Sequence, residues 1–274
     1  MRELVTMWKS TRMIVLAVLT AAIYAAVLIP FKAIPLVPGF TEIRVAQVVP
    51  PVASLLFGPA AAWGSAFGNL IADFFGTFGL GSLFGFVGNF FLGALPYVLW
   101  GRLGPLSAGG PPAMRDGRQV LEFVVLVVLS ALACAGIIAW GLEVLGIFPF
   151  TVLGTIIAIN NSLLPAVVGP FLLRLLYDRV RRMGLLWTDI MASADIGAGP
   201  AGLGTALMVI GAVGGWLVGM VVAAGLGGAF GMPGFGQFGR GGAASVVWGV
   251  TPFMAALALA LLTCRPRPEL YARS

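Results

Sequence analysis

The stretch at residues 13–31, MIVLAVLTAAIYAAVLIPF, decides the class of fold, because it is long, apolar and free of charged side chains. A helix of about 20 apolar residues crosses the hydrocarbon core of a bilayer, which is ~30 Å thick. Three basic residues precede the run, Arg2, Lys9 and Arg12. The run also exceeds the roughly 7–15 apolar residues of a signal-peptide core. We therefore expect a retained first transmembrane helix.

The composition of the whole chain extends this interpretation. Of its 274 residues 59% are apolar and only 9% are charged, and the mean hydropathy is +1.03. A soluble domain carries about 25% charged residues, so this chain cannot cover a water-facing surface. The composition indicates an integral membrane protein and excludes a soluble enzyme.

Residue types also exclude several chemistries. The chain has no histidine, and its two cysteines, Cys134 and Cys264, form no CxxC or Cys/His group. Histidine-based catalysis, histidine-ligated metal sites, zinc sites and disulfides therefore have no support. We expect no enzyme activity, no metal and no cofactor. The net charge of +6 arises from loops beside apolar runs, so membrane topology explains it better than nucleic-acid binding.

Seven further apolar segments follow the first, at residues 45–57, 60–75, 81–100, 120–140, 150–177, 203–228 and 243–264. The second segment is short for a straight crossing and contains Pro50-Pro51, so we expect it to be kinked or broken. Gly58-Pro59 predicts the turn to the third. The predicted fold is an all-α, polytopic membrane helical bundle.

The segments divide into three predicted parts. Residues 1–182 form a six-helix core that holds most of the buried polar groups. Residues 183–202 are a cytoplasmic linker, mostly loop. Residues 203–274 form an accessory hairpin of two Gly/Ala-rich transmembrane helices and a polar tail.

The distribution of basic residues predicts the orientation. With the N-terminus in the cytoplasm, only Lys32, Arg44 and Arg240 of the 16 Lys and Arg residues lie outside. Cytoplasmic loops carry an excess of Lys and Arg. We therefore expect a multi-pass protein of the cell membrane with an even number of spans and both termini in the cytoplasm.

Polar side chains in or beside hydrocarbon are costly, so each is a functional candidate. In the predicted orientation they gather in the outer or middle part of the first six spans. A channel needs polar lining throughout, so this asymmetry favours a pocket that opens outward. Adjacent Asn160 and Asn161 cannot both point into one cavity. The candidate substrate-binding residues are Glu42, Arg44, Gln47, Asn69, Asp73, Asn89 and Asn160.

Each candidate also has a structural alternative. Glu42 and Arg44 form a loop salt bridge in one interpretation, and Asp73 lies in the wet interface in another. Asparagines tie transmembrane helices together by hydrogen bonds. Several aromatic residues either line a planar ligand's pocket or pack in the bundle: Phe40, Trp63, Phe67, Phe86, Phe90, Trp140 and Phe148.

The first span carries Ala17, Ala21 and Ala25 at every fourth position, which places them on one helix face. Small residues on one face allow another helix to approach closely. The stripe is either an internal packing face or a docking face for a partner membrane protein.

Four stretches taken in order resemble a known family. They are residues 41–50 (TEIRVAQVVP), 55–64 (LLFGPAAAWG), 68–70 (GNL) and 81–89 (GSLFGFVGN). The chain resembles substrate-specific S components of energy-coupling factor (ECF) transporters, most closely the queuosine-precursor-like group, over about residues 10–182. It departs from the family in having Val45-Ala46-Gln47 in place of Val-Ser-Glu, and in its two extra spans.

The resemblance implies a mechanism. An S component binds a vitamin-like or nucleobase-like micronutrient from outside and associates with a transmembrane coupling subunit and two cytoplasmic ATPases. The resemblance also implies that the alanine stripe is the docking face, and that the loop at residues 32–44 is a lid. The chain has no P-loop sequence, so ATP would be bound by partners.

Three other functions stay open at this stage. A stand-alone permease or channel would need polar residues in the inner half of the spans as well. A membrane enzyme would need a pair of acids at the membrane surface. An assembly or scaffold protein would tolerate loss of the polar cluster.

Overall fold

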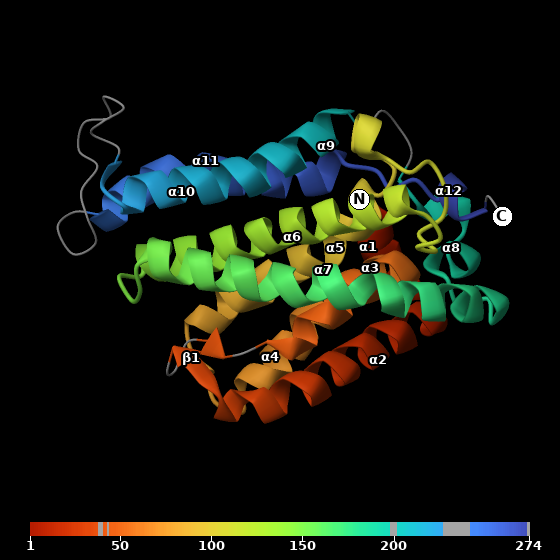
Figure 1. The fold of residues 1–274 in the computed structure, drawn as a ribbon, viewed down its shortest axis with the longest axis horizontal. Coiled ribbons are helices and arrows are strands. Elements are labelled where there is room, and N and C mark those ends of the chain that lie inside the picture. The colour runs from red at the N-terminus through yellow and green to blue at the C-terminus, as the bar shows by residue number, and fades with distance from the viewer. Residues whose placement is uncertain (38–40, 43, 198–201, 227–241, 273–274) are drawn as a thin grey trace.

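The computed structural model describes the chain except for residues 38–40, 43, 198–201, 227–241 and 273–274, and it is a bundle of long helices (Figure 1). Among the described residues, six helical segments are long and apolar enough to cross a membrane. They are Thr11–Ala33, Gly81–Leu99, Gly117–Val144, Phe150–Ile190, Gly202–Ala223 and Ser245–Thr263. The prediction of an all-α polytopic membrane protein is confirmed.

The first part of the bundle contains six principal helices. They are α2 (Thr11–Leu28), α3 (Val49–Phe57), α4 (Pro59–Asp73), α5 (Gly81–Leu99), α6 (Gly117–Val144) and α7 (Phe150–Arg182). The last part contains α9 (Gly202–Val209), a π-helical segment (Ile210–Gly214), α10 (Gly215–Ala223) and α11 (Gly242–Thr263). The short helices are α1 (Glu3–Thr6), α8 (Trp187–Ile190) and α12 (Glu269–Ala272). Strands β1 (Pro35–Val37) and β2 (Thr41–Glu42) pair antiparallel after α2.

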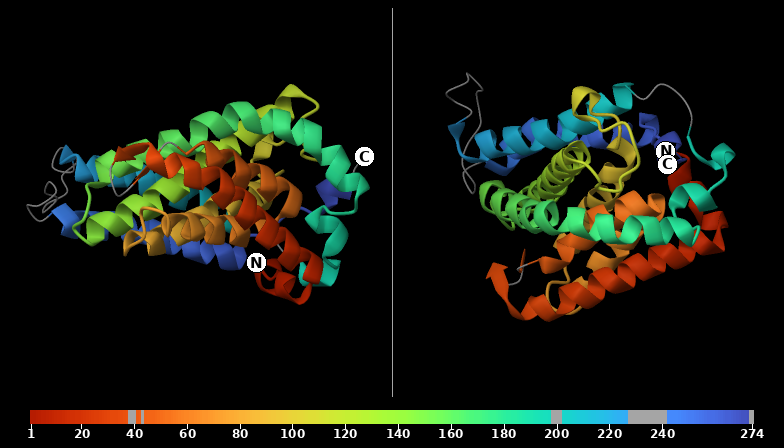
Figure 2. Two further views of the ribbon diagram at one scale, coloured as in Figure 1. Left: turned by 90° about the horizontal axis from the view of Figure 1, so that it is seen from below. Right: turned by 45° about the vertical axis from the view of Figure 1, so that its right-hand side comes forward.

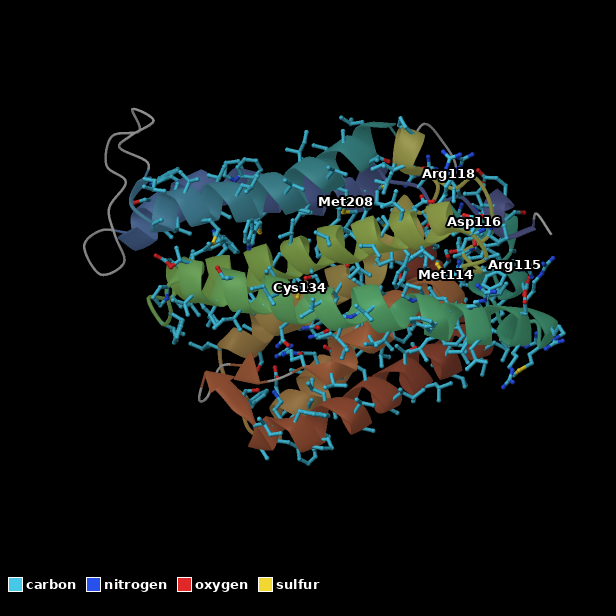
Figure 3. All side chains as sticks on the ribbon, viewed as in Figure 1. Met114, Arg115, Asp116, Arg118, Cys134 and Met208 are labelled. Atoms are coloured by element: carbon cyan, nitrogen blue, oxygen red, sulfur yellow. The ribbon has the colours of Figure 1, made fainter. Side chains whose placement is uncertain are left out.

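The bundle has two distinct ends. One end carries the β1–β2 pair and the α6–α7 turn, and we call it the hairpin end (Figure 1). The other carries α1, α8, α12 and both chain termini, and we call it the terminal end. Arg115 and Arg118 lie at the terminal end (Figure 3). These two arginines therefore lie away from the hairpin end.

The second and third predicted spans form a tight helical pair. A 3₁₀ turn (Val45–Val48) leads into α3, and Pro50 and Pro51 lie in the first turn of that helix, where proline is tolerated. Gly58 joins α3 to α4 with φ of 51°, and a Cβ there would lie 2.6 Å from Cγ of Trp187. Only glycine fits this position, because both the backbone and the indole ring exclude a side chain.

The segment after α7 is mostly loop in its described part, with the short helix α8, and Trp187 fixes it to the bundle. Its side chain is fully buried, and its ring lies 5.6 Å from the rings of both Tyr97 and Tyr271. The segment after α7 therefore packs onto the core and connects α5 with the C-terminal tail.

The last two long helices lie along one side of the bundle (Figure 2) and pack on it. Their glycines accept aromatic rings: a Cβ at Gly214 would lie 2.3 Å from Phe253, and one at Gly219 would lie 2.2 Å from Phe150. Val222 and Val250 join a core cluster that also contains Phe150. Close packing of these helices requires small residues at their contacts, which explains the Gly/Ala-rich composition.

The alanine stripe of α2 faces inward. Ala17, Ala21 and Ala25 are only 4–5% exposed. They pack against α4, where a Cβ at Gly64 would lie 2.7 Å from the Ala17 carbonyl oxygen and one at Gly68 would lie 2.9 Å from that of Ala21. In this structure the stripe is therefore an internal packing face between α2 and α4.

Ala21→Leu tests this assignment against Ala22→Leu, whose site is exposed on the same helix. Overpacking the α2–α4 contact should destabilise the isolated protein by about 1–3 kcal/mol, whereas Ala22→Leu should leave stability unchanged. Thermal unfolding in detergent measures both. Equal melting temperatures for the two variants would contradict internal packing.

Candidate functional site

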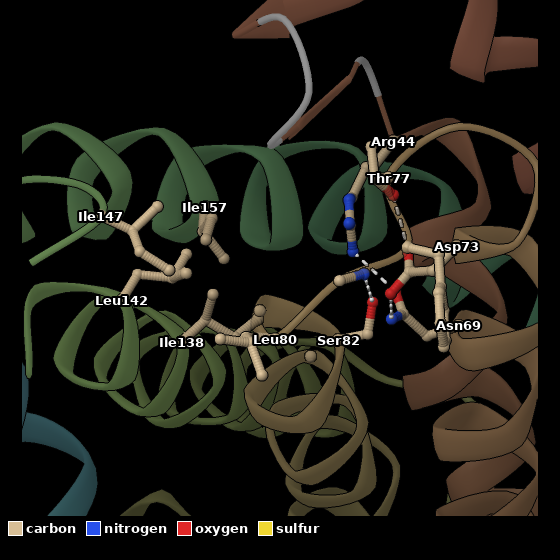
Figure 4. A pocket seen from close by; sticks show the side chains of 14 residues that line it. Arg44, Asn69, Asp73, Thr77, Leu80, Ser82, Ile138, Leu142, Ile147 and Ile157 are labelled. Carbon is tan, nitrogen blue, oxygen red and sulfur yellow. Dashed lines mark hydrogen bonds between the residues drawn. The ribbon is translucent and has the colours of Figure 1, made fainter. Parts of the chain in front are cut away.

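A cavity of about 230 Å³ opens at the hairpin end between α4, α5, α6 and α7 (Figure 4). One wall is polar and the opposite wall is aliphatic. The polar wall includes Arg44, Asn69, Asp73, Thr77 and Ser82, and the aliphatic wall is formed by Leu80, Ile138, Leu142, Ile147 and Ile157. A cavity with one polar and one apolar wall can bind a small ring compound by its edge and its face.

The polar wall is a hydrogen-bonded chain. Arg44 Nη1 donates to Asn69 Oδ1 at 3.0 Å, and Asn69 Nδ2 donates to Asp73 Oδ2 at 3.1 Å (Figure 4). Asn69 and Asp73 lie four residues apart on α4 and so share one face. Arg44, Asn69 and Asp73 are 7%, 1% and 5% exposed. These hydrogen bonds join a guanidinium and a carboxylate in one buried network.

The other carboxylate oxygen of Asp73 is bound from the α2 side. Lys32 Nζ lies 3.1 Å from Asp73 Oδ1, and the two side chains are 4% and 7% exposed. The Thr77 hydroxyl donates to the same oxygen at 3.0 Å and accepts from Lys32 at 2.6 Å. This buried ion pair anchors the segment that follows α2 to the end of α4.

Asn160 positions the backbone of Arg44 by a hydrogen bond. Its Oδ1 accepts from the backbone N–H of Arg44 at 3.2 Å. Asn160 is partly exposed, whereas Asn161 is fully buried and donates to Sγ of Cys134 at 3.3 Å. The two adjacent asparagines of α7 therefore face different partners, as the sequence predicted.

Gln47 and Asn89 lie below the cavity and do not line it. The hydroxyl of Tyr24 lies 2.9 Å from Gln47 Oε1 and 2.8 Å from Asn89 Oδ1. Asn89 Nδ2 donates to the carbonyl of Gly85 at 2.8 Å. All three side chains are fully buried.

The structure thus brings together most of the predicted site. Arg44, Asn69 and Asp73 line the cavity, Gln47 and Asn89 lie beneath it, and Asn160 positions Arg44. The side chain of Glu42 lies outside the described part of the structure, as does Phe40. The predicted set missed Lys32, Thr77, Ser82 and Tyr24. In the sequence, Lys32 stood out only as a charged residue in a loop. Thr77 could have been found because it follows Asp73 closely in the sequence.

The proposed aromatic walls need correction. Among the described lining residues the only aromatic one is Phe78. Trp63, Phe67, Phe86 and Phe90 instead form a ladder of ring contacts between α4 and α5, with centroids 5.0–6.1 Å apart. These rings pack the two helices together, and branched aliphatic side chains form the cavity wall.

Buried acids at the terminal end were also missed, and Glu122 is one of them. Glu122 is fully buried near the start of α6, where it accepts from the backbone N–H groups of Gly101 and Ala108 at 2.6 and 2.7 Å. Glu122 is thus bound to the backbone of the loop between α5 and α6. It therefore does not extend the polar cavity toward the terminal end.

The bundle is that of a multi-pass membrane protein, and a cavity with a polar wall lies at one of its ends. The model of the QueT transporter family matches residues 14–178. The chain therefore belongs to the QueT transporter family, which confirms the resemblance to the queuosine-precursor-like group of S components. Comparisons with curated proteins and with solved structures found no match.

A double-mutant cycle on Lys32→Met and Asp73→Asn measures the buried ion pair. Breaking a buried pair leaves an uncompensated charge, so we expect a coupling free energy of about 2 kcal/mol or more in thermal unfolding. The exposed pair Arg115–Asp178, with side chains 63% and 48% exposed, is the control. Its coupling should stay below about 1 kcal/mol. Equal coupling in the two pairs would contradict a buried anchor.

Proposed function

We propose that the protein is the substrate-binding subunit of an ECF-type importer that captures a vitamin-like or nucleobase-like micronutrient. The observation that carries the proposal is the cavity at the hairpin end, where the Arg44–Asn69–Asp73 chain faces an aliphatic wall. Membership of the QueT transporter family supports a transport role for this cavity.

The direction of capture follows from charge. Basic residues concentrate at the terminal end, and the positive-inside rule puts that end in the cytoplasm. Both termini are then cytoplasmic, and the cavity opens to the outside of the cell membrane. A solute binds from the exterior and must leave by a change in the position or shape of the bundle.

The walls indicate the chemistry of the solute. Asp73 and Asn69 accept from amino or ring N–H groups, while Arg44 donates to carbonyl or ring nitrogen atoms. Branched aliphatic side chains such as Ile138 and Ile157 cover the face of a flat ring. A cavity of about 230 Å³ suits a compact heterocycle with several polar edge atoms.

Energy must come from partners, because the chain has no P-loop sequence. We propose a transmembrane coupling subunit and two cytoplasmic ATPases as these partners. The alanine stripe of α2 is covered by α4, so the coupling subunit would contact another surface or a different arrangement of α2.

Solute binding to the purified chain tests the site. Arg44→Ala and Asn69→Ala should each weaken binding of the solute that co-purifies, identified by mass spectrometry, by about tenfold or more, because both side chains line the cavity and their loss leaves polar groups of the solute unpaired. Arg115→Ala, in the exposed pair at the terminal end, is the matched control and should bind like the parent. Unchanged affinity in both site variants would contradict the proposed location of the binding pocket.

Uptake experiments test the proposed coupling. Cells that express the chain together with the coupling subunit and both ATPases should accumulate the labelled solute, and cells that lack these partners should not. Equal uptake without the partners would favour the stand-alone permease, which is the alternative function.

A further inference from the structure

A second hollow, an apolar groove of about 390 Å³, lies between α1, α4, α5 and α11. It shares no lining residue with the polar cavity at the hairpin end. Val87 of α5 and Leu262 of α11 line it and are 44% and 68% exposed. Both residues belong to helices that are long and apolar enough to cross a membrane. The groove is therefore open to the hydrocarbon of the bilayer.

The lining of the groove is apolar throughout, apart from one indole N–H group. That group belongs to Trp63 of α4 and donates to the carbonyl oxygen of Leu4 at 3.0 Å. The floor includes Phe90 and Phe91 of α5, which are 9% and 4% exposed. Such a surface offers no hydrogen-bonding group to a polar solute, so its occupant must be apolar.

Helix α1 forms one wall of the groove and is held from three sides. The indole bond fixes it to α4. The amino group of Met1 donates to the carbonyl oxygen of Leu261 on α11 at 2.7 Å. The hydroxyl of Thr6 donates to the carbonyl oxygen of Asp195 at 3.0 Å. The groove is thus preformed, and it lies where α11 of the C-terminal hairpin meets α4 and α5 of the six-helix core.

Two basic side chains lie beside the groove. Arg2 is three positions before the lining residue Val5 in helical backbone, so the two share a face. Lys9 follows Trp8, whose ring lies 5.6 Å from that of Trp63 in the groove wall. Arg2 and Lys9 are exposed, and neither forms an ion pair within the described part of the chain.

No acid of the described residues lines the groove. Glu3, the acid nearest to Arg2 in sequence, is fully buried and accepts from the backbone N–H of Gly197 at 3.1 Å. The two cations therefore give the neighbourhood of the groove a positive charge that no carboxylate of the lining offsets.

An apolar groove beside two exposed cations matches an anionic phospholipid. An acyl chain fits the apolar walls, and a phosphate oxygen accepts hydrogen bonds from a guanidinium or an ammonium. In the orientation proposed above, the terminal end faces the cytoplasm, and the cytoplasmic leaflet carries anionic lipids that attract basic segments. A zwitterionic lipid has the same chains and phosphate, but its own ammonium group opposes the two cations.

We propose that an anionic phospholipid binds here, with one acyl chain in the groove between α1, α5 and α11 and its headgroup at Arg2 and Lys9. The bound lipid fills the junction between the six-helix core and the C-terminal hairpin and stabilises their contact at the terminal end. The proposal goes beyond solute capture and does not depend on which solute the hairpin-end cavity takes.

Lipid binding to the purified full chain in detergent, followed by native mass spectrometry, tests this site. The probes are dioleoyl phosphatidylglycerol, which is anionic, and dioleoyl phosphatidylcholine, which is zwitterionic. The parent should bind phosphatidylglycerol at least about tenfold more tightly, because each basic residue near a headgroup contributes roughly fivefold. Excess inorganic phosphate should not displace the lipid, since a free anion cannot occupy the apolar groove.

Two variants and a control locate the headgroup and the chain. Arg2→Gln should reduce the preference for phosphatidylglycerol by about fivefold. Val87→Trp places a large ring in the groove and should weaken binding of both lipids by about tenfold or more. Arg182→Gln removes the same charge from an exposed position at the end of α7 and should bind like the parent. Arg2 and Val87 are exposed, so both variants should fold, and their melting temperatures check this.

The contrary results are distinct for each part of the site. Equal binding of the two lipids by the parent, or an Arg2→Gln variant that keeps the full preference, would overturn the headgroup site. Displacement of the lipid by inorganic phosphate, or a Val87→Trp variant that binds both lipids like the parent, would overturn the acyl-chain groove. Either result would leave solute capture untouched, because Arg44→Ala and Asn69→Ala test that function separately.

Discussion

The site depends on one continuous set of interactions, from the guanidinium of Arg44 through Asn69 and Asp73 to the ammonium of Lys32. Removing an ion from water costs several kcal/mol, and a partner with good geometry must offset that cost. Neither arginine nor aspartate could be buried at this depth alone. This hydrogen-bonded network supplies such partners, and it ties the segments before and after the β1–β2 pair to α4.

Close helix packing makes this arrangement possible. Gly64 and Gly68 of α4 lie against the alanines of α2, so the two helices approach closely and Tyr24 reaches Gln47 and Asn89. Gly85 leaves room beside the polar wall of the cavity, and Gly88 lets Ile138 and Cys134 of α6 pack closely on α5. Small residues on three helices thus serve two purposes, since they bring backbones together and also leave space beside the polar wall. A lipid-exposed polar group would have no such environment.

The sequence predicted the class of fold and much of the site because both follow from the cost of polarity in hydrocarbon. Arg44, Asn69 and Asp73 stood out as polar groups at the outer ends of apolar runs. Lys32 did not, because a loop lysine is normally solvated, and only the tertiary fold buries it against Asp73. The role of the alanine stripe was open for a similar reason: a small-residue face indicates contact and does not name the partner. Trp187 was hidden in a segment that reads mostly as loop, and its indole ring packs where Gly58 has no side chain.

The account's central claim is that a small heterocycle occupies the cavity beside Asn69 and Asp73. The most direct test is native mass spectrometry of the purified chain beside the Gly85→Leu variant. A Cβ at Gly85 would lie 3.1 Å from Asn69 Nδ2 and 3.6 Å from Asp73 Oδ2, so the leucine fills the cavity. The parent should carry one small solute, and the folded variant should carry none. Retention of the same solute by Gly85→Leu would contradict this location for the binding site.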